Sequence, residues 1–414
     1  MNRWEYAKEL MPGGSQVVSK RSERFLPDGW PSFYSRAKGC YCYDLEGNRY
    51  ADFAGMGVGA CILGYADDDV DGAVYNAMRD GVMCTLNNPK ETELAEKLIE
   101  LHPWADMVRL GKTGGEACAV AVRLARAATG NSAIAVCGYH GWHDWYLAAN
   151  LFDTSELDEH LLEGLEPRGV PSELLTTVFP FTYGDLKALE EIILALDDGI
   201  GTIIMEPGRE KVDGKFLYAV RSLANQHGIV LIFDEVTSGF RVNVGGIHMT
   251  TGVCPDLAVF GKAMGNGYPI SAVIGRRNLM EQDTFISSTM WSEATGTAAA
   301  LETLDILHRL DVPAIVTYYG KLLSSRMKQM GLNVKSGIPP LLHIDTNNTE
   351  QTMLTQEMLK LGYLFGSSVY VSYAHTESII NQFLQDLEIV LGNVRGGKVK
   401  LEGRVKTDGF KRLT

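Results

Sequence analysis

The sequence predicts an α/β protein with a large domain, built on a mostly parallel central sheet flanked by helices, and a small α+β domain formed by both chain ends. The first observation behind this prediction is a set of apolar, β-branched runs at residues 133–136, 202–205, 229–233 and 257–260. Such runs indicate strands that are buried on both faces, which is typical of parallel sheets covered by helices. The second observation is that glycine-containing loops separate these runs from amphipathic, helix-like stretches.

The two chain ends predict the small domain. Residues 32–53 alternate in polarity around a turn signal at Glu46-Gly47-Asn48, which predicts a β-hairpin. Beyond residue 300 the pattern predicts helices at 301–310, 314–330 and 377–391, and strands near 340–346 and 368–374.

These patterns set the expected domain boundaries. We expect residues 1–50 and 301–392 to form the small domain and residues 51–300 to form the large domain. The basic tail at 393–414 lacks helical periodicity, and we expect it to be solvated or docked on a partner rather than to bind an anion.

Composition narrows the class of function. The 414-residue chain carries a net charge of −13, which argues against nucleic acid or an anionic membrane as its main partner. It has neither a long apolar run typical of a transmembrane helix nor the apolar core of a signal peptide. Its seven scattered cysteines are typical of a reducing compartment. We therefore expect a soluble, acidic, cytoplasmic protein.

A Thr-Gly-Gly turn, Thr113-Gly114-Gly115, opens an amphipathic helical stretch. Such a turn presents unpaired backbone N–H groups and the positive end of the helix dipole, which together favour a phosphate group. It matches neither Walker A nor G-x-G-x-x-G. Taken alone, a turn of this kind is more often a plain N-cap than a ligand site.

Residues 138–144 follow the expected strand at 133–136 and contain Tyr139, His140 and His143. Ligands of α/β sheets bind at the carboxyl ends of strands, so Tyr139 is placed to face a planar cofactor or, equally, to cover the sheet edge. A zinc site built on His140 and His143 is not favoured, because no third ligand stands nearby.

Two charged residues end apolar strands. Asp234 follows the run at 229–233, and burying its charge is costly without a cationic partner, which could be a metal ion or a protonated pyridine nitrogen. Lys262 follows the run at 257–260, where desolvation would depress its pKa and make it nucleophilic. A lysine that merely extends its ammonium group to solvent is the commoner alternative for any single strand-end lysine.

The four features occur together in one chain: a phosphate turn, an aromatic ring, a strand-end aspartate and a strand-end lysine. A ligand that needs all four has a phosphate, a planar ring, a pyridinium nitrogen and an aldehyde that reacts with an amine. Pyridoxal 5′-phosphate (PLP) is such a ligand.

The chain also resembles the class III (subgroup II) PLP-dependent aminotransferases of fold type I, and within them the glutamate-1-semialdehyde 2,1-aminomutases. The resemblance covers nearly the whole chain and is carried by residues 11–14 (MPGG), 43–50 (YDLEGNRY), 139–141 (YHG), 205–207 (MEP), 233–236 (FDEV), 239–241 (GFR), 255–257 (PDL), 261–262 (GK) and 374–377 (AHTE). It implies a transaminase or an aminomutase, with Lys262 as the catalytic residue that binds PLP as a Schiff base.

The resemblance also implies the remaining cofactor contacts. Asp234 pairs with the pyridinium nitrogen, Tyr139 and Val236 cover the two ring faces, and Thr113, Gly114 and Gly115 bind the phosphate. His140 accompanies Tyr139 in the cofactor-binding set, Glu206 lies near the substituents of the cofactor, and Thr289 reaches the phosphate of a second subunit. A homodimer with shared active sites is therefore implied.

The sequence departs from the family pattern at several positions. Gly115 stands where the family's Ser-Gly-Thr turn has a hydroxyl, so one side-chain contact is missing or replaced. Trp291 and Glu293 replace a small turn after Thr289, and they either reshape the substrate pocket or pack at the dimer interface. Ser367 stands where the mutase has a glutamate.

The substrate prediction follows from these departures. We expect an aminotransferase with glutamate as donor and a keto or aldehyde acceptor, such as a sugar in surface-polysaccharide synthesis. Lys20, Arg21 and Arg241 are the candidate cations for a substrate carboxylate. The alternatives are intramolecular amino transfer of the glutamate-1-semialdehyde type and a catalytically idle PLP-binding scaffold.

Overall fold

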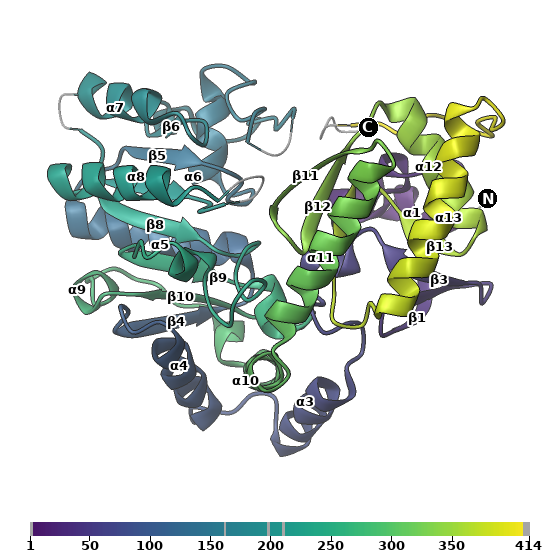
Figure 1. Ribbon diagram of the computed structural model, residues 1–414. Coiled ribbons are helices and arrows are strands. Elements are labelled where there is room, and N and C mark those ends of the chain that lie inside the picture. Colours follow the sequence, from purple (N-terminus) through teal and green to yellow (C-terminus); the bar gives the residue numbers. More distant parts are fainter. Residues whose placement is uncertain (1–2, 161–162, 197–198, 209–211, 409–414) are drawn as a thin grey trace. The chain divides into compact units, whose positions relative to one another are not determined.

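The computed structural model describes residues 3–160, 163–196, 199–208 and 212–408, and the chain divides into two compact units (Figure 1). The large unit spans Asp68–Pro313, and the small unit joins Met1–Asp67 to Ala314–Thr414. Both boundaries lie further along the chain than the residues 50 and 300 that we expected. The first boundary shifts because the strand at residues 49–53 pairs inside the small unit.

A seven-stranded sheet forms the centre of the large unit, in the order β4-β10-β9-β8-β7-β5-β6. Its strands are β4 (Met107–Gly111), β5 (Ile134–Cys137), β6 (Val178–Pro180), β7 (Thr202–Met205), β8 (Val230–Asp234), β9 (Leu257–Phe260) and β10 (Ser271–Gly275). Neighbours from β9 to β6 are parallel, whereas β10 runs antiparallel to both β9 and β4. The four strands predicted from apolar runs, and the mostly parallel sheet, are confirmed.

Helices cover both faces of this sheet, which explains why its central strands are mostly apolar. Ile204 and Ile232 pack with α5 (Gly114–Thr129) in one buried cluster. Ile203 and Leu231, one residue earlier in each strand, pack with α7 (Leu186–Ala195) and α8 (Gly214–His227) in a second cluster. Alternate strand residues therefore point to opposite faces, and each fully buried side chain of this kind contributes about 1.5–3 kcal/mol.

The remaining elements of the large unit connect these strands. They are α3 (Asp68–Asp80), α4 (Pro89–Leu101), α6 (Asp144–Leu147), α9 (Arg277–Met280) and α10 (Ala294–Arg309), with the 3-10 turns η4 (Ala148–Leu151), η5 (Ser172–Leu174), η6 (Ile247–Thr250), η7 (Lys262–Gly265) and η8 (Thr289–Ser292). No helix in the described part of the chain combines the length and hydropathy of a membrane span.

Two small sheets and three long helices build the small unit. The first sheet has the order β1-β2-β3-β13, and the second has the order β11-β12-β14. Their strands are β1 (Tyr34–Lys38), β2 (Tyr41–Asp44), β3 (Arg49–Phe53), β11 (Asn333–Ile338), β12 (Leu341–Asp345), β13 (Tyr363–Phe365) and β14 (Ser368–Tyr370). The helices are α1 (Arg3–Leu10), α2 (Met56–Gly59), α11 (Val312–Gln329), α12 (Asn348–Lys360) and α13 (Glu377–Arg395), and the turns η1 (Pro12–Gly14), η2 (Val18–Lys20) and η3 (Ser22–Arg24) lie between α1 and β1.

The predicted hairpin at residues 32–53 is a three-stranded antiparallel arrangement of β1, β2 and β3. The expected turn at Gly47 is present, with φ at 88°. A second turn at Gly39, with φ at 59°, creates the additional strand. Glycine tolerates this left-handed backbone without steric cost.

The two chain ends are tied together inside the small unit. Strand β13 pairs in parallel with β3, so Tyr363 lies opposite Ala51. His375 is buried, and its Nε2 donates to the Asp52 carbonyl at 2.9 Å while its Nδ1 accepts from Ser372 N–H at 3.0 Å. Thr376 then caps α13. The AHTE segment therefore joins the N-terminal and C-terminal parts of this unit.

The tail differs from the expectation that it is solvated or docked on a partner. Helix α13 continues to Arg395, and the residues that follow, as far as 408, contact the small unit of the same chain. The Arg404 guanidinium donates to Asp28 at 2.7 Å, and Lys406 N–H donates to Thr352 at 3.0 Å. Opposite charge and main-chain hydrogen bonds thus hold the tail in place. Residues 409–414 lie outside the described residues.

Candidate active site

Most of the predicted site residues meet at the carboxyl edge of the large sheet. Register aligns the ends of three parallel strands, because Cys137 and Met205, the last residues of β5 and β7, pair with each other and Met205 pairs with Phe233, next to the end of β8. The residues that follow these positions are therefore neighbours at one edge. This register brings Tyr139, Glu206 and Asp234 together, and Lys262 follows β9, the next strand of the sheet.

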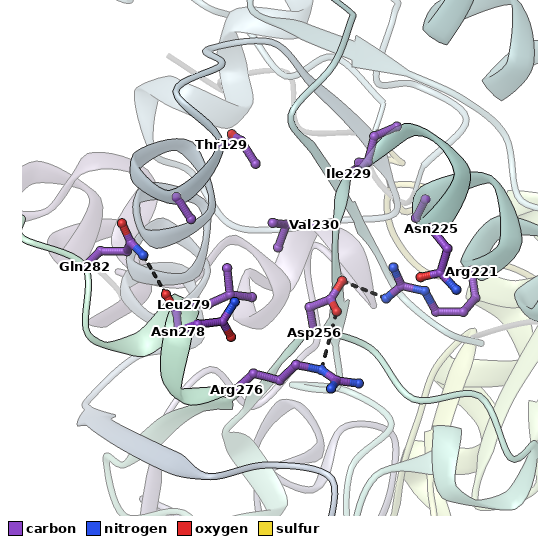
Figure 2. Close-up of a pocket in the computed structure, with 13 residues that line it drawn as sticks. Thr129, Arg221, Asn225, Ile229, Val230, Asp256, Arg276, Asn278, Leu279 and Gln282 are labelled. Atoms are coloured by element: carbon purple, nitrogen blue, oxygen red, sulfur yellow. Dashed lines mark hydrogen bonds and ion pairs between the residues drawn. The ribbon is translucent and has the colours of Figure 1, made fainter.

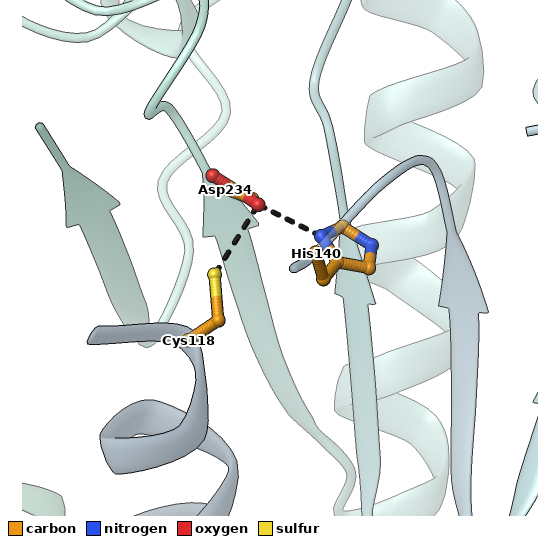
Figure 3. Close-up of side chains that lie close together, drawn as sticks. All are labelled: Cys118, His140 and Asp234. Atoms are coloured by element: carbon orange, nitrogen blue, oxygen red, sulfur yellow. Dashed lines mark hydrogen bonds and ion pairs between the residues drawn. The ribbon is translucent and has the colours of Figure 1, made fainter. Parts of the chain in front are cut away.

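Asp234 is buried among hydrogen-bond donors, as Figure 3 shows. His140 Nδ1 lies 2.8 Å from one carboxylate oxygen, and the Cys118 thiol donates to the same oxygen at 3.3 Å. Val236 N–H donates to the other oxygen at 3.0 Å. The structure thus brings together Asp234 and His140, two of the predicted site residues, and adds Cys118 from α5.

The electrostatics of this cluster keep Asp234 ionised. Burial raises the pKa of Asp234, but the hydrogen bond and charge of His140, the Val236 N–H group and the Cys118 thiol more than offset it, so the pKa lies below its usual value. Cys118, His140 and Asp234 are close enough to ligate a metal ion. The Nδ1–H group of His140 and the S–H group of Cys118 point at the Asp234 carboxylate, however, which is the geometry of donors around an anion.

Lys262 has a strained backbone at the start of η7. Its φ is 44°, in the left-handed region that costs a residue with a side chain of the order of 1–3 kcal/mol and that clusters at functional sites. Its Nζ donates to the Thr237 hydroxyl at 2.9 Å. Thr237 belongs to the loop that follows Asp234. The lysine and the aspartate are therefore attached to one loop.

A buried network holds this loop. Glu235 is fully buried and accepts from His248 Nδ1 at 2.8 Å and from His248 N–H at 3.0 Å, and the Ser238 hydroxyl also donates to it. Arg241 is 1% exposed, and its Nε donates to the Thr237 carbonyl at 2.6 Å. This contact assigns Arg241, a candidate for binding substrate, to supporting the loop.

The phosphate turn is confirmed as a helix N-terminus. Thr113 caps α5 in a capping box, in which its hydroxyl accepts from Glu116 N–H and Glu116 accepts from Thr113 N–H. The first N–H groups of a helix have no partner within it, so those of Gly114 and Gly115 are the donors available for an anion.

Two glycines of this turn are closely packed. A Cβ atom on Gly114 would lie 2.8 Å from Val236, which places the predicted ring-covering valine against the phosphate turn. A Cβ atom on Gly115 would lie 3.0 Å from Cε1 and 3.1 Å from Nδ1 of His143. The loop that carries Tyr139 and His140 therefore lies directly against the start of α5.

Glu206 fixes the other side of the same loop. It is buried, and its carboxylate accepts from Tyr139 N–H at 3.3 Å. A Cβ atom on Gly138 would lie 2.7 Å from this carboxylate, so the glycine allows the close approach. The Tyr139 ring packs edge-on against Tyr146, with the ring centroids 6.0 Å apart.

Thr289 stands apart from the other predicted residues. It begins η8 and is exposed, and no contact joins it to Asp234 or to the phosphate turn among the described residues. An exposed threonine is available to another molecule, which is the arrangement that a contact with a second subunit requires.

Trp291 and Glu293 have structural partners. Glu293 caps α10 by accepting from Thr295 N–H and Gly296 N–H, and it also accepts from Lys112 Nζ, next to the phosphate turn. Trp291 packs against Gly111, the last residue of β4. These two residues therefore fasten the Thr289 segment to the phosphate turn, and their contacts do not depend on a substrate pocket.

A second group of charges lies at the opposite, amino edge of the sheet. A surface cavity of about 380 Å³ contains Asp256 between Arg221 and Arg276 (Figure 2). Arg221 donates to Asp256 at 2.7 Å, and Arg276 lies 3.6 Å from its other oxygen. This cavity is separate from the cluster of predicted site residues, which follows the far ends of the same strands.

Sequence reasoning missed Cys118, Thr237 and the Lys112–Glu293 pair. Cys118 lies four residues after Gly114, so helical spacing could have placed it on the same face of α5. Thr237 lies three residues after Asp234 and carries the only hydroxyl between Glu235 and Ser238. Lys112 and Glu293 are 181 residues apart, and no local pattern links them.

The residues fit PLP on observations of this structure. Asp234 is a buried carboxylate kept ionised by donors that do not carry a permanent charge. Lys262 is strained and tied to the same loop, and the glycines of the phosphate turn leave N–H donors at a helix N-terminus.

Comparisons with known proteins agree with this assignment. A sequence model of the family "Aminotransferase class-III" matches residues 27–338. The 3-aminobutyryl-CoA aminotransferase of Cloacimonas acidaminovorans is 37% identical over 350 residues, which are 82% of this chain and 80% of that protein. The 2'-deamino-2'-hydroxyneamine transaminase of Streptomyces kanamyceticus is 30% identical over 370 residues, 86% of this chain and 90% of that protein.

A third relative and a solved structure complete the comparison. The glutamate-1-semialdehyde 2,1-aminomutase of Methanothrix thermoacetophila is 31% identical over 422 residues, 94% of this chain and 95% of that protein. The FumI protein of Sphingopyxis sp. MTA144, solved in its PLP internal aldimine form, has a TM-score of 0.85 and 25% identity, covering 96% of this chain and 97% of that one.

Proposed function

The chain belongs to the class-III aminotransferases, which are PLP-dependent enzymes of fold type I, and from this premise we propose that it transfers an amino group from a small amino donor to a carbonyl acceptor other than a simple α-keto acid. One observation supports the proposal above the others. Asp234, His140, Thr237 and Lys262 meet at the carboxyl edge of one sheet, with the carboxylate ionised and the lysine attached to its loop.

Each residue has a proposed role toward the cofactor. PLP supplies an electron sink that stabilises negative charge on the substrate carbon. Asp234 holds a positive charge at the ring nitrogen, Tyr139 and Val236 confine the ring, and the N–H groups of Gly114 and Gly115 hold the phosphate. Lys262 Nζ binds the cofactor and carries protons to and from the substrate, with Thr237 Oγ1 orienting it.

The donor and acceptor stay proposals. We propose glutamate as donor, and Lys20 and Arg21 stay candidate cations for its carboxylate from the sequence. A keto or aldehyde sugar is our proposed acceptor, and it draws support from the relative named for an aminoglycoside, 2'-deamino-2'-hydroxyneamine. The original reason for a sugar, an altered pocket at Trp291 and Glu293, is weakened by the structural partners of both residues.

A homodimer is also part of the proposal. The connector after α3 exposes Val82, Met83 and Leu86, and Val82 O accepts from Ala294 N–H, next to the segment that exposes Met290 and Thr289. A cluster of exposed apolar side chains is typical of a protein interface. All seven cysteines are free, which supports our proposal of a cytoplasmic location.

A half-reaction assay tests the amino transfer. The purified PLP-loaded enzyme is mixed with glutamate in the absence of an acceptor, and released 2-oxoglutarate is counted per active site. A transaminase releases one keto acid per site and then stops until a carbonyl acceptor, such as a keto sugar or a 3-oxoacyl thioester, restarts the reaction. Failure of a panel of amines to release any keto product would contradict the proposal.

The aminomutase alternative is favoured by the 31% identity with a glutamate-1-semialdehyde 2,1-aminomutase, and disfavoured by Ser367 at the position of the mutase glutamate. The two activities differ in stoichiometry, because a mutase converts glutamate-1-semialdehyde without a second substrate. Rapid isomerisation of that compound would establish the alternative. Lys262→Ala tests the alternative of a catalytically idle scaffold. If the variant loses the bound-cofactor absorbance band but leaves the biological output unchanged, the scaffold is favoured.

A further inference from the structure

The phosphate turn lacks a hydroxyl at Gly115, and the structure places an imidazole in the space that such a side chain would fill. A Cβ atom built on Gly115 lies 3.1 Å from His143 Nδ1 and 3.0 Å from its Cε1. The position of His143 in this space depends on a second glycine, because a Cβ atom on Gly141 would lie 3.0 Å from the Gly115 Cα. The two backbones approach closely, and His143 enters from the neighbouring loop.

The Nδ1 atom of His143 is a buried polar atom without a hydrogen-bond partner among the described residues. Buried polar atoms are nearly always paired in native proteins, so an orphan at a ligand site indicates a partner that belongs to the ligand. The atom lies beside the N-terminus of α5, where the phosphate of PLP is expected. The orphan atom, the missing hydroxyl and the family's phosphate turn thus coincide at one place.

The surroundings hold His143 in this position. Its ring stacks on Trp142, with the centroids 4.6 Å apart and the planes at 21°. Its carbonyl accepts from Tyr146 N–H at 2.9 Å and from Leu147 N–H at 3.1 Å, which fixes its backbone at the start of α6. A side chain held in advance loses little conformational entropy when it binds a ligand.

We propose that His143 binds the phosphate group of PLP, with Nδ1–H donating to a phosphate oxygen in place of the hydroxyl that the family carries at the position of Gly115. The proposal rests on the PLP site described above and adds a residue to it. Burial lowers the pKa of His143, while Glu116 on α5 and Asp144 on α6 oppose this shift. A neutral imidazole still has one N–H group to donate.

Cofactor affinity tests the proposal without measuring catalysis. The apoenzyme is titrated with PLP and, separately, with pyridoxal, which lacks the phosphate. His143→Phe should raise the dissociation constant for PLP about tenfold to a hundredfold, the effect expected from losing one hydrogen bond to a charged group, and leave that for pyridoxal unchanged. His227→Phe removes an exposed histidine and should change neither value.

A rescue variant guards against a merely structural effect. The double variant His143→Ala with Gly115→Ser vacates the space and restores the family hydroxyl, so it should recover most of the PLP affinity that His143→Ala alone loses. The phosphorus NMR signal of bound PLP should move in His143→Phe and not in His227→Phe.

Three outcomes would overturn the assignment: unchanged PLP affinity in His143→Phe, equal losses for PLP and pyridoxal, or no recovery in the double variant. Failure of the wild-type protein to bind PLP at all would instead contradict the cofactor site as a whole. The two failures are therefore distinguishable.

Discussion

Two aspartates at opposite edges of the large sheet show how similar residues serve different purposes. Asp256, at the amino edge, lies between Arg221 and Arg276 and also accepts from Leu231 N–H at 2.8 Å. Asp234, at the carboxyl edge, is bound by a histidine, a thiol and one backbone N–H group. The permanent charges of two arginines satisfy Asp256. The donors around Asp234 carry no permanent positive charge, so they do not cancel its negative charge. Asp234 can therefore hold a cation that arrives with a ligand.

The largest expected effect comes from the lysine at the carboxyl edge. Lys262→Ala removes the amine that binds the cofactor and moves the proton, and we expect kcat to fall by about 10³-fold or more. Two quantities are measured: the steady-state rate of transamination, and the absorbance band of the lysine-bound cofactor, which lies at a longer wavelength than that of free PLP and should be lost. Arg276→Ala, at the amino edge, should leave kcat unchanged. A large loss of activity in Arg276→Ala would break the contrast between the two edges.

The aspartates themselves provide the next test. Asp234→Asn removes the charge that pairs with the ring nitrogen, and we expect kcat to fall about 10²- to 10³-fold with little change in stability. Asp256→Asn should leave kcat unchanged and lower the free energy of unfolding by about 2 kcal/mol, because hydrogen bonds from charged groups are lost. Kinetics and chemical denaturation are measured on both variants, and equal effects in the two would contradict the comparison.

A smaller effect is expected from the partner of Asp234. The pKa of Asp234 lies below its usual value, with the hydrogen bond from His140 as the largest lowering influence. His140→Gln should raise this pKa, so Asp234 becomes protonated at a higher pH. The acid limb of the kcat/KM profile should therefore move to higher pH, and less so in Cys118→Ser, which keeps a donor. If the acid limb does not move in His140→Gln, the ionisation of Asp234 does not determine the pH dependence of kcat/KM.

The smallest effect concerns the fastening of the Thr289 segment. Burial raises the pKa of Glu293, but Lys112, Thr295 and Gly296 lower it to about 2, below its ordinary value of 4.5. The ionised Glu293 therefore stabilises the fold above about pH 4.5, and this contribution is lost as the pH falls from about 4.5 to about 2.

Glu293→Gln should accordingly lower Tm at pH 7, and the difference from wild type should vanish as the pH falls through this range. Glu281→Gln is the matched control, because its partner Arg277 is exposed and such pairs contribute little. A Tm difference that persists at pH 2 would show that Glu293 acts through something other than its charge.

The sequence could predict the strands and the residues that end them. The runs at 203–205 and 229–233 are apolar at every position because both sheet faces are covered, and Asp234 and Lys262 stand out because charge follows such runs. The antiparallel strand β10 was not predicted, because its direction depends on its pairing with β4 and β9 and no local pattern encodes it.

The finer structure of the site depends on contacts between distant segments. Gly115 suggested a missing hydroxyl, but only the approach of the loop at Gly141 brings His143 into the gap. The sequence leaves Glu293 open between a changed substrate pocket and a dimer interface, and the structure adds its bond with Lys112. Both contacts come from packing between elements, which a single sequence does not contain.

The pairing of β3 with β13 has a consequence for biosynthesis. Residues 49–53 leave the ribosome well before their partner strand at 363–365 and before His375, which donates to Asp52. The first strands therefore keep one edge unpaired while the compact unit of residues 68–313 is synthesised. A product released before residue 363 thus keeps an open strand edge that recruits chaperones or aggregates.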